Sequence, residues 1–265
     1  MSASFKVATW NVNSLRLRLP QVLAWLQANE PTALLLQETK VEDALFPLAE
    51  LHAAGWQAVY HGQKSYNGVA ILARTLPTDV QLGFTTKPEA TENQSRVIGA
   101  TVAGVRLLNL YLPQGEATDS PKFAFKERIY QALTTELQTL AAQYPQFIAS
   151  GDYNISADER DVPIPAKRAE KQVMFTPAEQ SWFKQVQTAS GLRDALRLIN
   201  QEAGIYSWYD YRMYGRAPHH GWRIDYHLVS PALQPKVRNV VHHTAVRALP
   251  QPSDHIPVVL ELDLA

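Results

Sequence analysis

Short runs of apolar and β-branched residues recur along the chain and predict a protein rich in β-strands. Each run has the length and composition that are typical of a strand. The predicted strands are Phe5–Trp10, Ala33–Gln37, Gly68–Ala73, Val97–Val102, Val105–Tyr111, Phe147–Ala149, Trp222–Val229, Val237–His242 and Ile256–Leu262.

Helical patterns lie between some of these strands. Pro20–Ala28 has apolar side chains at helical spacing, and Pro20 suits a first turn. Pro121–Tyr144 is long and periodic, and Thr176 with Glu179 forms a capping box that opens another helix. Many strands with a few helices favour two sheets packed face to face and covered by helices, an α/β (α+β) fold. We find no linker, so we expect residues 1–265 to form one domain.

The composition narrows the class of protein. The chain has 265 residues, of which 46% are hydrophobic and 19% charged, so it can build a sizeable core. It has 25 Lys and Arg against 25 Asp and Glu, which argues against a globally basic nucleic-acid coat protein but leaves room for a local basic groove. The absence of cysteine excludes disulfides, thiolate metal sites and cysteine nucleophiles.

The amino-terminal residues lack the apolar stretch of a signal peptide. No window approaches the roughly 20 apolar residues of a membrane span. We therefore expect a soluble cytoplasmic protein that does not bind membranes.

Polar side chains gather at the ends of the predicted strands. Side chains in such positions are held by a rigid scaffold and can converge in a cleft. They are Asn11, Asn13, Glu38, Tyr111, Asp152, Asn154, Asp225, Asp254 and His255.

This set fits the hydrolysis of a phosphodiester, which needs an aligned water molecule and neutralised charge. The carboxylates of Glu38 and Asp254 are hard ligands that suit Mg²⁺ or Mn²⁺. Asp152 can orient or deprotonate water, and Asn154 can hold that water or a phosphate oxygen.

The remaining polar side chains can bind the phosphate group of the substrate. His255 can donate to a phosphoryl oxygen if Asp225 fixes its tautomer and favours its charged form. The phenol of Tyr111 can touch the same phosphate.

Each of these residues also has an ordinary explanation. Asp152 after Gly151 suits a turn, Glu38 can pair with Lys40, and Tyr111 can be a half-buried strand residue. The joint placement favours the chemical interpretation, because independent turns rarely supply one complementary catalytic set.

With these polar residues in their order along the chain, the sequence resembles the exonuclease III family of metal-dependent DNA repair nucleases, within the wider endonuclease/exonuclease/phosphatase superfamily. The resemblance covers nearly the whole chain in order and implies a four-layered α/β sandwich with the site at one edge of the two sheets. The segments that carry it are Trp10–Arg16, Leu36–Lys40, Gly68–Ala70, Leu110–Gly115, Gly151–Ile155, Gly221–Tyr226 and Ser253–His255.

The resemblance also implies roles for single residues. Glu38 resembles the principal metal ligand, with Asn11, Asn13 and Asp254 nearby, and the expected ion is Mg²⁺, with Mn²⁺ as an alternative. The remaining set resembles the catalytic groups, namely Asp152 at the water, Asn154 as its partner at the phosphate, the pair of Asp225 and His255, and Tyr111 on the phosphate.

In the DNA repair branch, residues like Trp208, Trp222 and Ile224 line a small pocket for a baseless sugar. Ordinary core packing is the alternative for both tryptophans. The residue before Phe175 borders the same pocket, and abasic-site (AP) endonucleases usually carry glycine, alanine or serine there. In this chain it is Met174, which predicts that internal abasic-site cleavage is weakened or lost while attack at a 3′ end survives.

Contacts to DNA are expected to be directed at the phosphate backbone, since a repair enzyme acts on many sequences. The candidates are Lys122, Lys126, Lys167, Arg168, Lys171, Arg212, Arg216 and Arg223, with His219 and His220 beside them.

The sequence thus predicts a monomeric, Mg²⁺-dependent DNA repair phosphodiesterase. Its expected substrate is double-stranded DNA with 3′ ends, nicks or abasic sites, on which it acts as a 3′-to-5′ exonuclease and a remover of 3′-phosphates and other blocking 3′ groups. The alternatives are a full AP endonuclease, a phosphodiesterase for small molecules or lipids, and a non-catalytic DNA-binding module.

Overall fold

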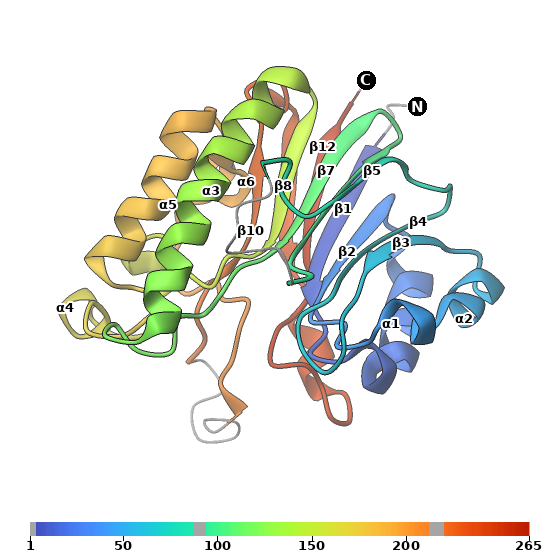
Figure 1. The fold of residues 1–265 in the computed structure, drawn as a ribbon, viewed down its shortest axis with the longest axis horizontal. Coiled ribbons are helices and arrows are strands. Elements are labelled where there is room, and N and C mark those ends of the chain that lie inside the picture. The colour runs from blue at the N-terminus through green and yellow to red at the C-terminus, as the bar shows by residue number, and fades with distance from the viewer. Residues whose placement is uncertain (1–3, 87–93, 212–219, 265) are drawn as a thin grey trace.

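The computed structural model describes residues 4–86, 94–211 and 220–264. Two six-stranded sheets pack face to face, and helices cover the outer face of each (Figure 1). This is the four-layered sandwich that the sequence resemblance implies. Among the described residues, no helix is both long and apolar enough to cross a membrane.

The first sheet has the strand order β11-β12-β1-β2-β4-β3. Its strands are β1 (Ser4–Asn11), β2 (Ala33–Gln37), β3 (Gln57–His61), β4 (Val69–Ala73), β11 (Val237–His242) and β12 (Val258–Asp263). Helices α1 (Leu15–Asn29) and α2 (Leu48–Ala53) pack on its outer face, where Trp10 and Leu36 meet Trp25 and Leu51 in one apolar cluster.

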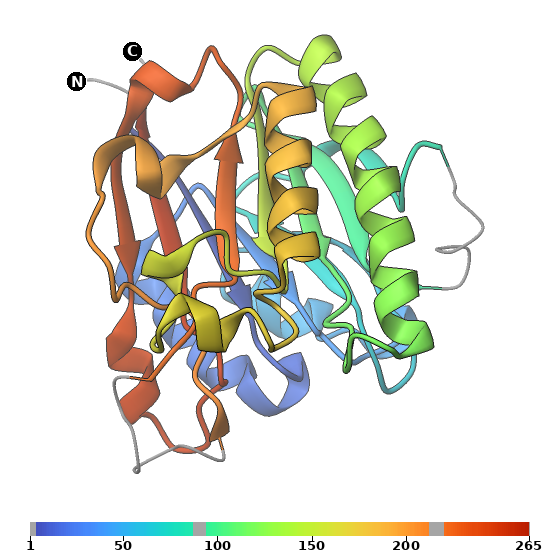
Figure 2. The same ribbon diagram turned by 90° about the vertical axis from the view of Figure 1, so that its left-hand side faces the viewer.

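The second sheet has the order β5-β6-β7-β8-β10-β9. Its strands are β5 (Thr78–Leu82), β6 (Val97–Val102), β7 (Val105–Tyr111), β8 (Phe147–Asp152), β9 (Arg193–Asp194) and β10 (Asp225–Val229). The long helices α3 (Pro121–Gln143) and α5 (Pro177–Ser190) run side by side across its outer face (Figure 2). The short helices are α4 (Ala166–Ala169), α6 (Ala195–Ile199) and the 3₁₀ turns η1 (Asp43–Leu45), η3 (Glu159–Asp161), η5 (Gln234–Lys236) and η6 (Thr244–Ala248).

All nine predicted strand regions contain a strand, but β3, β5 and β9 were not predicted. The edge strand β5 is largely exposed, so it lacks an apolar run. The prediction for the first helix was wrong in its start, because α1 begins at Leu15 and contains Pro20. The N–H groups of Ser14 and Leu15 donate to the carbonyl oxygens of Glu38 and Thr39 at 2.8 and 3.0 Å, which anchors the first turn beside the end of β2.

The inner faces of the sheets change from apolar to polar along the strands. Side chains alternate between the faces of a strand, so the inward set on β7 begins with Val105 and Leu107 and ends with Asn109 and Tyr111. The strand β1 pairs in parallel with β2, and β7 pairs in parallel with β8. Their carboxyl ends therefore lie at one edge of the sandwich, where the polar residues collect.

Buried hydrogen bonds tie the two sheets together below this edge. The Gln37 side-chain amide on β2 donates to Asn109 Oδ1 on β7 at 2.6 Å. Asn109 in turn donates to the carbonyl oxygens of Leu36 and Ala70 at 2.8 and 2.9 Å. Because these groups are fully buried, breaking the contacts would leave unpaired polar atoms, so they fix one sheet against the other.

His227 forms a second tie between the sheets. Its Nε2–H donates to the Val258 carbonyl oxygen at 3.0 Å, and its Nδ1 accepts from the Ser150 hydroxyl at 2.7 Å. The ring is neutral in this arrangement, and burial lowers its pKa from 6.5 to about 4.

We therefore expect the free energy of unfolding to decrease as the pH falls from about 6.5 to 4, by roughly 3 kcal/mol from this residue. The unfolded chain takes up a proton at His227 in this range and the folded chain does not. Urea unfolding between pH 4 and 7.5 measures the effect. His227→Phe should lose this part of the dependence of the unfolding free energy on pH. His52→Asn, a change at an exposed site, should keep it. Equal slopes in all three proteins would contradict the assignment.

Candidate active site

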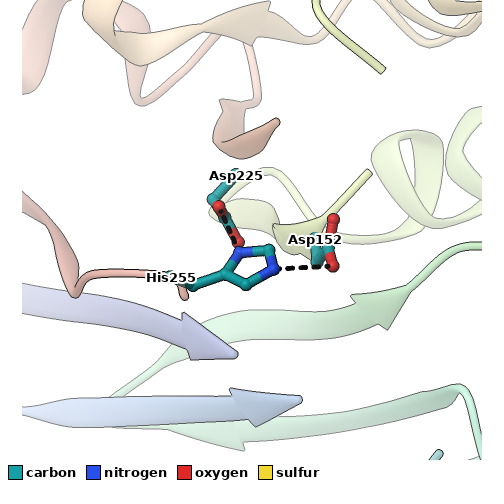
Figure 3. Close-up of side chains that lie close together, drawn as sticks. All are labelled: Asp152, Asp225 and His255. Carbon is teal, nitrogen blue, oxygen red and sulfur yellow. Dashed lines mark hydrogen bonds and ion pairs between the residues drawn. The ribbon is translucent and has the colours of Figure 1, made fainter. Parts of the chain in front are cut away.

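The polar strand ends meet at one edge of the sandwich and draw on both sheets. Asn11 ends β1 in the first sheet, and Asp152 ends β8 in the second. Asp152 lies opposite Tyr111 of β7 and opposite Asp225, which begins β10. Figure 3 shows Asp225, His255 and Asp152 side by side.

Gly151 allows Asp152 to take this position. It has a φ of +145°, and a Cβ there would lie 2.0 Å from the carbonyl oxygen of Leu110. Any side chain would push β8 away from β7. The glycine before Asp152 is thus explained by the close approach of two strands.

His255 lies between two buried aspartates. Its Nδ1 is 2.9 Å from Asp225 Oδ2, and its Nε2 is 3.7 Å from Asp152 Oδ2. Asp225 and His255 come from segments far apart in the sequence, and both are nearly inaccessible to solvent. This is the carboxylate–imidazole pair that the sequence predicts.

The two carboxylates control the protonation of His255. Burial alone would lower the pKa of the imidazole, but Asp225 and then Asp152 outweigh it and raise the pKa to about 10. Burial raises the pKa of Asp152 from 3.8 to about 7, while His255 opposes that shift. At neutral pH the proton therefore resides on His255, and Asp152 lies close to its own titration point.

Asn11 joins Asp152 to Glu38. Its side-chain amide donates to Glu38 Oε1 at 2.9 Å and to Asp152 Oδ2 at 3.0 Å. Its Oδ1 accepts from the N–H of Asn13 at 3.0 Å. One asparagine thus links a carboxylate of the first sheet to a carboxylate of the second.

Asn154 holds Asp152 from the other side. Its N–H donates to Asp152 Oδ1 at 2.9 Å. Its side-chain amide donates to Asp152 Oδ2 at 3.2 Å and to the Leu112 carbonyl oxygen at 2.8 Å. These bonds favour the ionised carboxylate and fix its orientation.

Several residues around the site adopt the left-handed backbone conformation that is uncommon outside glycine. Glu38 and Asn154 both have φ of +50°, and Met174 has φ of +82°. Such conformations cost about 1–3 kcal/mol each and persist where the surroundings hold them.

Tyr111 lies beside Glu38 at the end of β7. Burial first, and then the negative charge of Glu38, raise the pKa of its phenol well above 10, so it stays a donor. The guanidinium of Arg96 lies 4.8 Å from the centre of the Tyr111 ring. Arg96 was not among the predicted residues, since nothing in its sequence context distinguishes it from a surface arginine.

Two of the four predicted metal ligands, Glu38 and Asn13, bind one cationic group, and Asn11 and Asp254 are hydrogen-bonded to these two. Lys40 Nζ lies 2.8 Å from Glu38 Oε2 and 2.5 Å from Asn13 Oδ1. The Asn13 amide donates to Asp254 Oδ1 at 3.1 Å, and Trp208 Nε1 donates to Asp254 Oδ2 at 3.0 Å. The donor set is oxygen-rich and already attracts a positive charge, so it fits a hard cation such as Mg²⁺.

Asp152, Asp225 and His255 form another group whose ligand atoms lie within 4.8 Å of one another. It is the less suitable metal site, because the imidazole is protonated and both of its nitrogens face carboxylates. The Glu38 side is therefore the better candidate for a hard cation, and the His255 side holds a proton.

A cavity of about 680 Å³ opens beside the site. Met174, Trp208 and Trp222, which the sequence places at a substrate pocket, line it. Ile224 does not line this cavity, which corrects the prediction for that residue: like Phe175, it is buried in the apolar cluster behind these residues. A second cavity of about 630 Å³ is lined by Glu38 and Tyr111 among others. Gln114 and Glu116 line both cavities, so their loop separates the two.

The structure contradicts the predicted role of Arg223 in substrate binding. Its side chain is 1% exposed and forms two hydrogen bonds to Asp161, at 2.7 and 3.1 Å, and one to Asp194 at 2.6 Å. The sequence shows an arginine beside a catalytic motif, but not that two aspartates from other segments bury it.

Lys126 is likewise buried and cannot contact a phosphate, which corrects a second prediction. Arg168, Lys171 and His220 line the first cavity, and Lys122 lines the second. Lys167 is exposed on α4. The remaining candidates, Arg212, Arg216 and His219, lie outside the described residues.

Ser207 is a supporting residue that the sequence did not reveal. Its hydroxyl accepts from the N–H groups of Ile224 and Asp225 at 3.1 and 3.0 Å, which fixes the start of β10. A lone serine in a loop carries no signal of a partner so far along the chain.

Comparisons with known proteins agree with this geometry. The model of the endonuclease/exonuclease/phosphatase family matches residues 8–255. The exodeoxyribonuclease III of Haemophilus influenzae is 33% identical over 267 residues, which cover 97% of this chain and 99% of that protein.

Solved structures match over the same length. A 3′ phosphatase from Neisseria, bound to a product DNA hairpin, is 43% identical with a TM-score of 0.92, covering 98% of this chain and 99% of that chain. An AP endonuclease from Archaeoglobus fulgidus is 35% identical with a TM-score of 0.90, covering 98% and 100%. The similarity therefore includes both sheets and the edge where the polar residues meet.

Proposed function

The chain belongs to the endonuclease/exonuclease/phosphatase family, and from this premise we propose that it is a DNA repair nuclease of the exonuclease III type that acts at 3′ ends. The observation that carries the proposal is the continuous network from Glu38 through Asn11 and Asp152 to His255 and Asp225. It supplies a base, a proton donor and an oxygen-rich cation site within one edge of the sandwich.

We assign the role of general base to Asp152. Its raised pKa places it near the pH at which a carboxylate can accept a proton from water. The hydrogen bonds from Asn11 and Asn154 hold both of its oxygens, so the carboxylate presents a fixed lone pair to the water. The oxygen of the water attacks phosphorus as its proton passes to Asp152, and the bond between phosphorus and the leaving oxygen of the substrate breaks.

His255 supplies a positive charge beside the phosphoryl group of the substrate. Its imidazolium donates to a phosphoryl oxygen and stabilises the negative charge that develops there. Asp225 orients the ring through Nδ1 and keeps it protonated. Tyr111 supplies a further neutral donor on the Glu38 side.

The proposed metal is Mg²⁺. Glu38 would hold it, with Asn11, Asn13 and Asp254 around it. A bound divalent cation neutralises phosphoryl charge and supports the leaving oxygen. The residues of the chain supply the remaining steps, which are proton acceptance by Asp152 and donation by His255.

A substrate panel tests the function. We expect the protein to release nucleotides from a recessed 3′ end and phosphate from a 3′-phosphate, to lose both activities in EDTA, and to recover them with Mg²⁺. A lipid phosphodiester should remain intact, and duplex binding should weaken as salt rises. Hydrolysis of the lipid without hydrolysis of DNA would reject the proposal and favour the small-molecule alternative. DNA binding without any hydrolysis would identify a non-catalytic module.

Met174 directs this activity toward 3′ ends in our proposal, because its side chain stands at the wall of the first cavity. Met174→Gly is expected to raise the incision of an internal abasic analogue on the order of 10- to 100-fold. Glycine also suits the φ of +82° at this position, so the variant should fold. Incision and 3′-phosphate removal are measured on matched duplexes.

Met174→Leu is the matched control, since it keeps the bulk and should leave internal incision low. Efficient internal incision by the unchanged protein, or no change in Met174→Gly, would favour a full AP endonuclease.

A further inference from the structure

Lys126 lies on α3 with its ammonium group fully buried beneath the candidate active site. The group donates to Glu179 Oε1 at 2.5 Å, to the carbonyl oxygen of Asn154 at 2.7 Å and to the carbonyl oxygen of Gln114 at 3.0 Å. An ammonium has three N–H bonds, so every donor has an acceptor. The acceptors come from the loop after β7, the loop after β8 and the start of α5.

Glu179 extends these contacts to the wall of the first cavity. Its Oε1 also accepts from the N–H of Met174 at 3.0 Å. Its Oε2 accepts from the N–H of Thr176 at 3.0 Å and from the Thr176 hydroxyl at 2.8 Å. Both side chains of the pair are inaccessible to solvent. One ion pair therefore holds Asn154, Gln114 and Met174 at fixed distances from each other.

We propose that Lys126, paired with Glu179, is a positioning residue for the hydrolysis reaction. It acts by holding Asn154 against Asp152 and by holding Gln114 and Met174 at the cavity. The inference rests on the proposed nuclease function, since it concerns the same site.

The hydrogen bonds of Asn154 show what the support does. Its N–H and its side-chain amide both bind Asp152, while its carbonyl oxygen accepts from Lys126. Without the bond from Lys126 to the Asn154 carbonyl oxygen, the peptide can relax and carry these donors away from the general base.

Stability alone is a weak reason for a buried ion pair, because apolar side chains of similar size often serve as well. Burial lowers the pKa of Lys126, and the Glu179 carboxylate opposes that shift. A lysine fits because three acceptors in different directions suit an ammonium and do not suit the planar fork of an arginine. The arrangement of the acceptors, more than the charge, is therefore what this residue satisfies.

The test compares variants of the whole protein on a recessed 3′ end. Lys126→Met is expected to lower kcat by about 10- to 100-fold with little change in KM, as a displacement of about 1 Å can do. Lys126→Met/Glu179→Gln leaves no buried charge, and Lys126→Arg keeps the charge beside Glu179. The double variant and Lys126→Arg should show the same loss of kcat as Lys126→Met. Any of the three variants that folds therefore tests the inference.

Glu136→Gln is the matched control. Glu136 is a fully buried carboxylate on the same helix, but its partners are Gln81 and Thr85 at the far edge of the second sheet. The Glu136→Gln variant should have a lower midpoint of thermal unfolding, without a change in kcat of more than about twofold.

Circular dichroism verifies that each variant is folded at the assay temperature. Unchanged kcat in the folded Lys126 variants, or an equal loss in Glu136→Gln, would overturn the inference. If the unsubstituted protein has no nuclease activity, the proposed function fails instead.

Discussion

Replacing Asp152 with asparagine is expected to lower kcat for hydrolysis at a 3′ end by about 10⁴-fold. Asparagine has nearly the same shape but cannot accept the proton of the attacking water. It also takes away the negative charge that faces His255 Nε2 at 3.7 Å. Single-turnover hydrolysis of a recessed 3′ end measures the loss.

The same variant should bind duplex DNA at least as well as the original protein, because one buried negative charge is removed near the phosphate. Glu261→Gln is a suitable control, as Glu261 pairs with Lys6 on strands of the first sheet outside the active-site network. It should retain full activity. A loss of less than about tenfold in Asp152→Asn would mean that another group accepts the proton.

Replacing Arg223 with methionine is expected to reduce the free energy of unfolding by about 3–5 kcal/mol. Methionine keeps much of the volume but removes the guanidinium that binds both aspartates, so Asp194 loses its cationic partner and Asp161 keeps only Arg197. The contact of Arg223 with the Tyr226 ring, at 4.3 Å, is lost as well. Urea unfolding at pH 7 measures the change.

Arg238→Met is the matched control for Arg223→Met. Arg238 pairs with Asp263 at 2.9 Å, but its side chain is 62% exposed, so the change should stay below about 1 kcal/mol. If Arg223→Met unfolded like the original protein and only raised KM, Arg223 would be a substrate contact after all.

Most of the site residues that can be predicted from the sequence lie at the ends of strands. Polar residues after apolar runs are a local signal, and strands of one sheet bring their ends to one edge. This placed Asn11, Tyr111, Asp152 and Asp225 together, and Asp254 and His255 precede the last strand in the same way. The four-layered fold follows from the same runs together with the family resemblance.

The burial of charged side chains is the part that could not be predicted. Lys126 and Arg223 look like surface cations in the sequence, because their partners Glu179 and Asp161 come from segments that only the folded chain brings near. The left-handed backbone of Met174 is equally hidden, since methionine gives no signal of a positive φ. Such features depend on contacts across the whole molecule.

The position of β12 has a consequence for synthesis on the ribosome. This strand lies between β1, the amino-terminal strand of the sheet, and β11, and it begins shortly after His255. Residues 258–263 must therefore leave the exit tunnel before the first sheet can close around Asn11. A nascent chain that stops short of them has an open strand edge beside the active site, so we expect no cleavage of DNA before translation has passed this point.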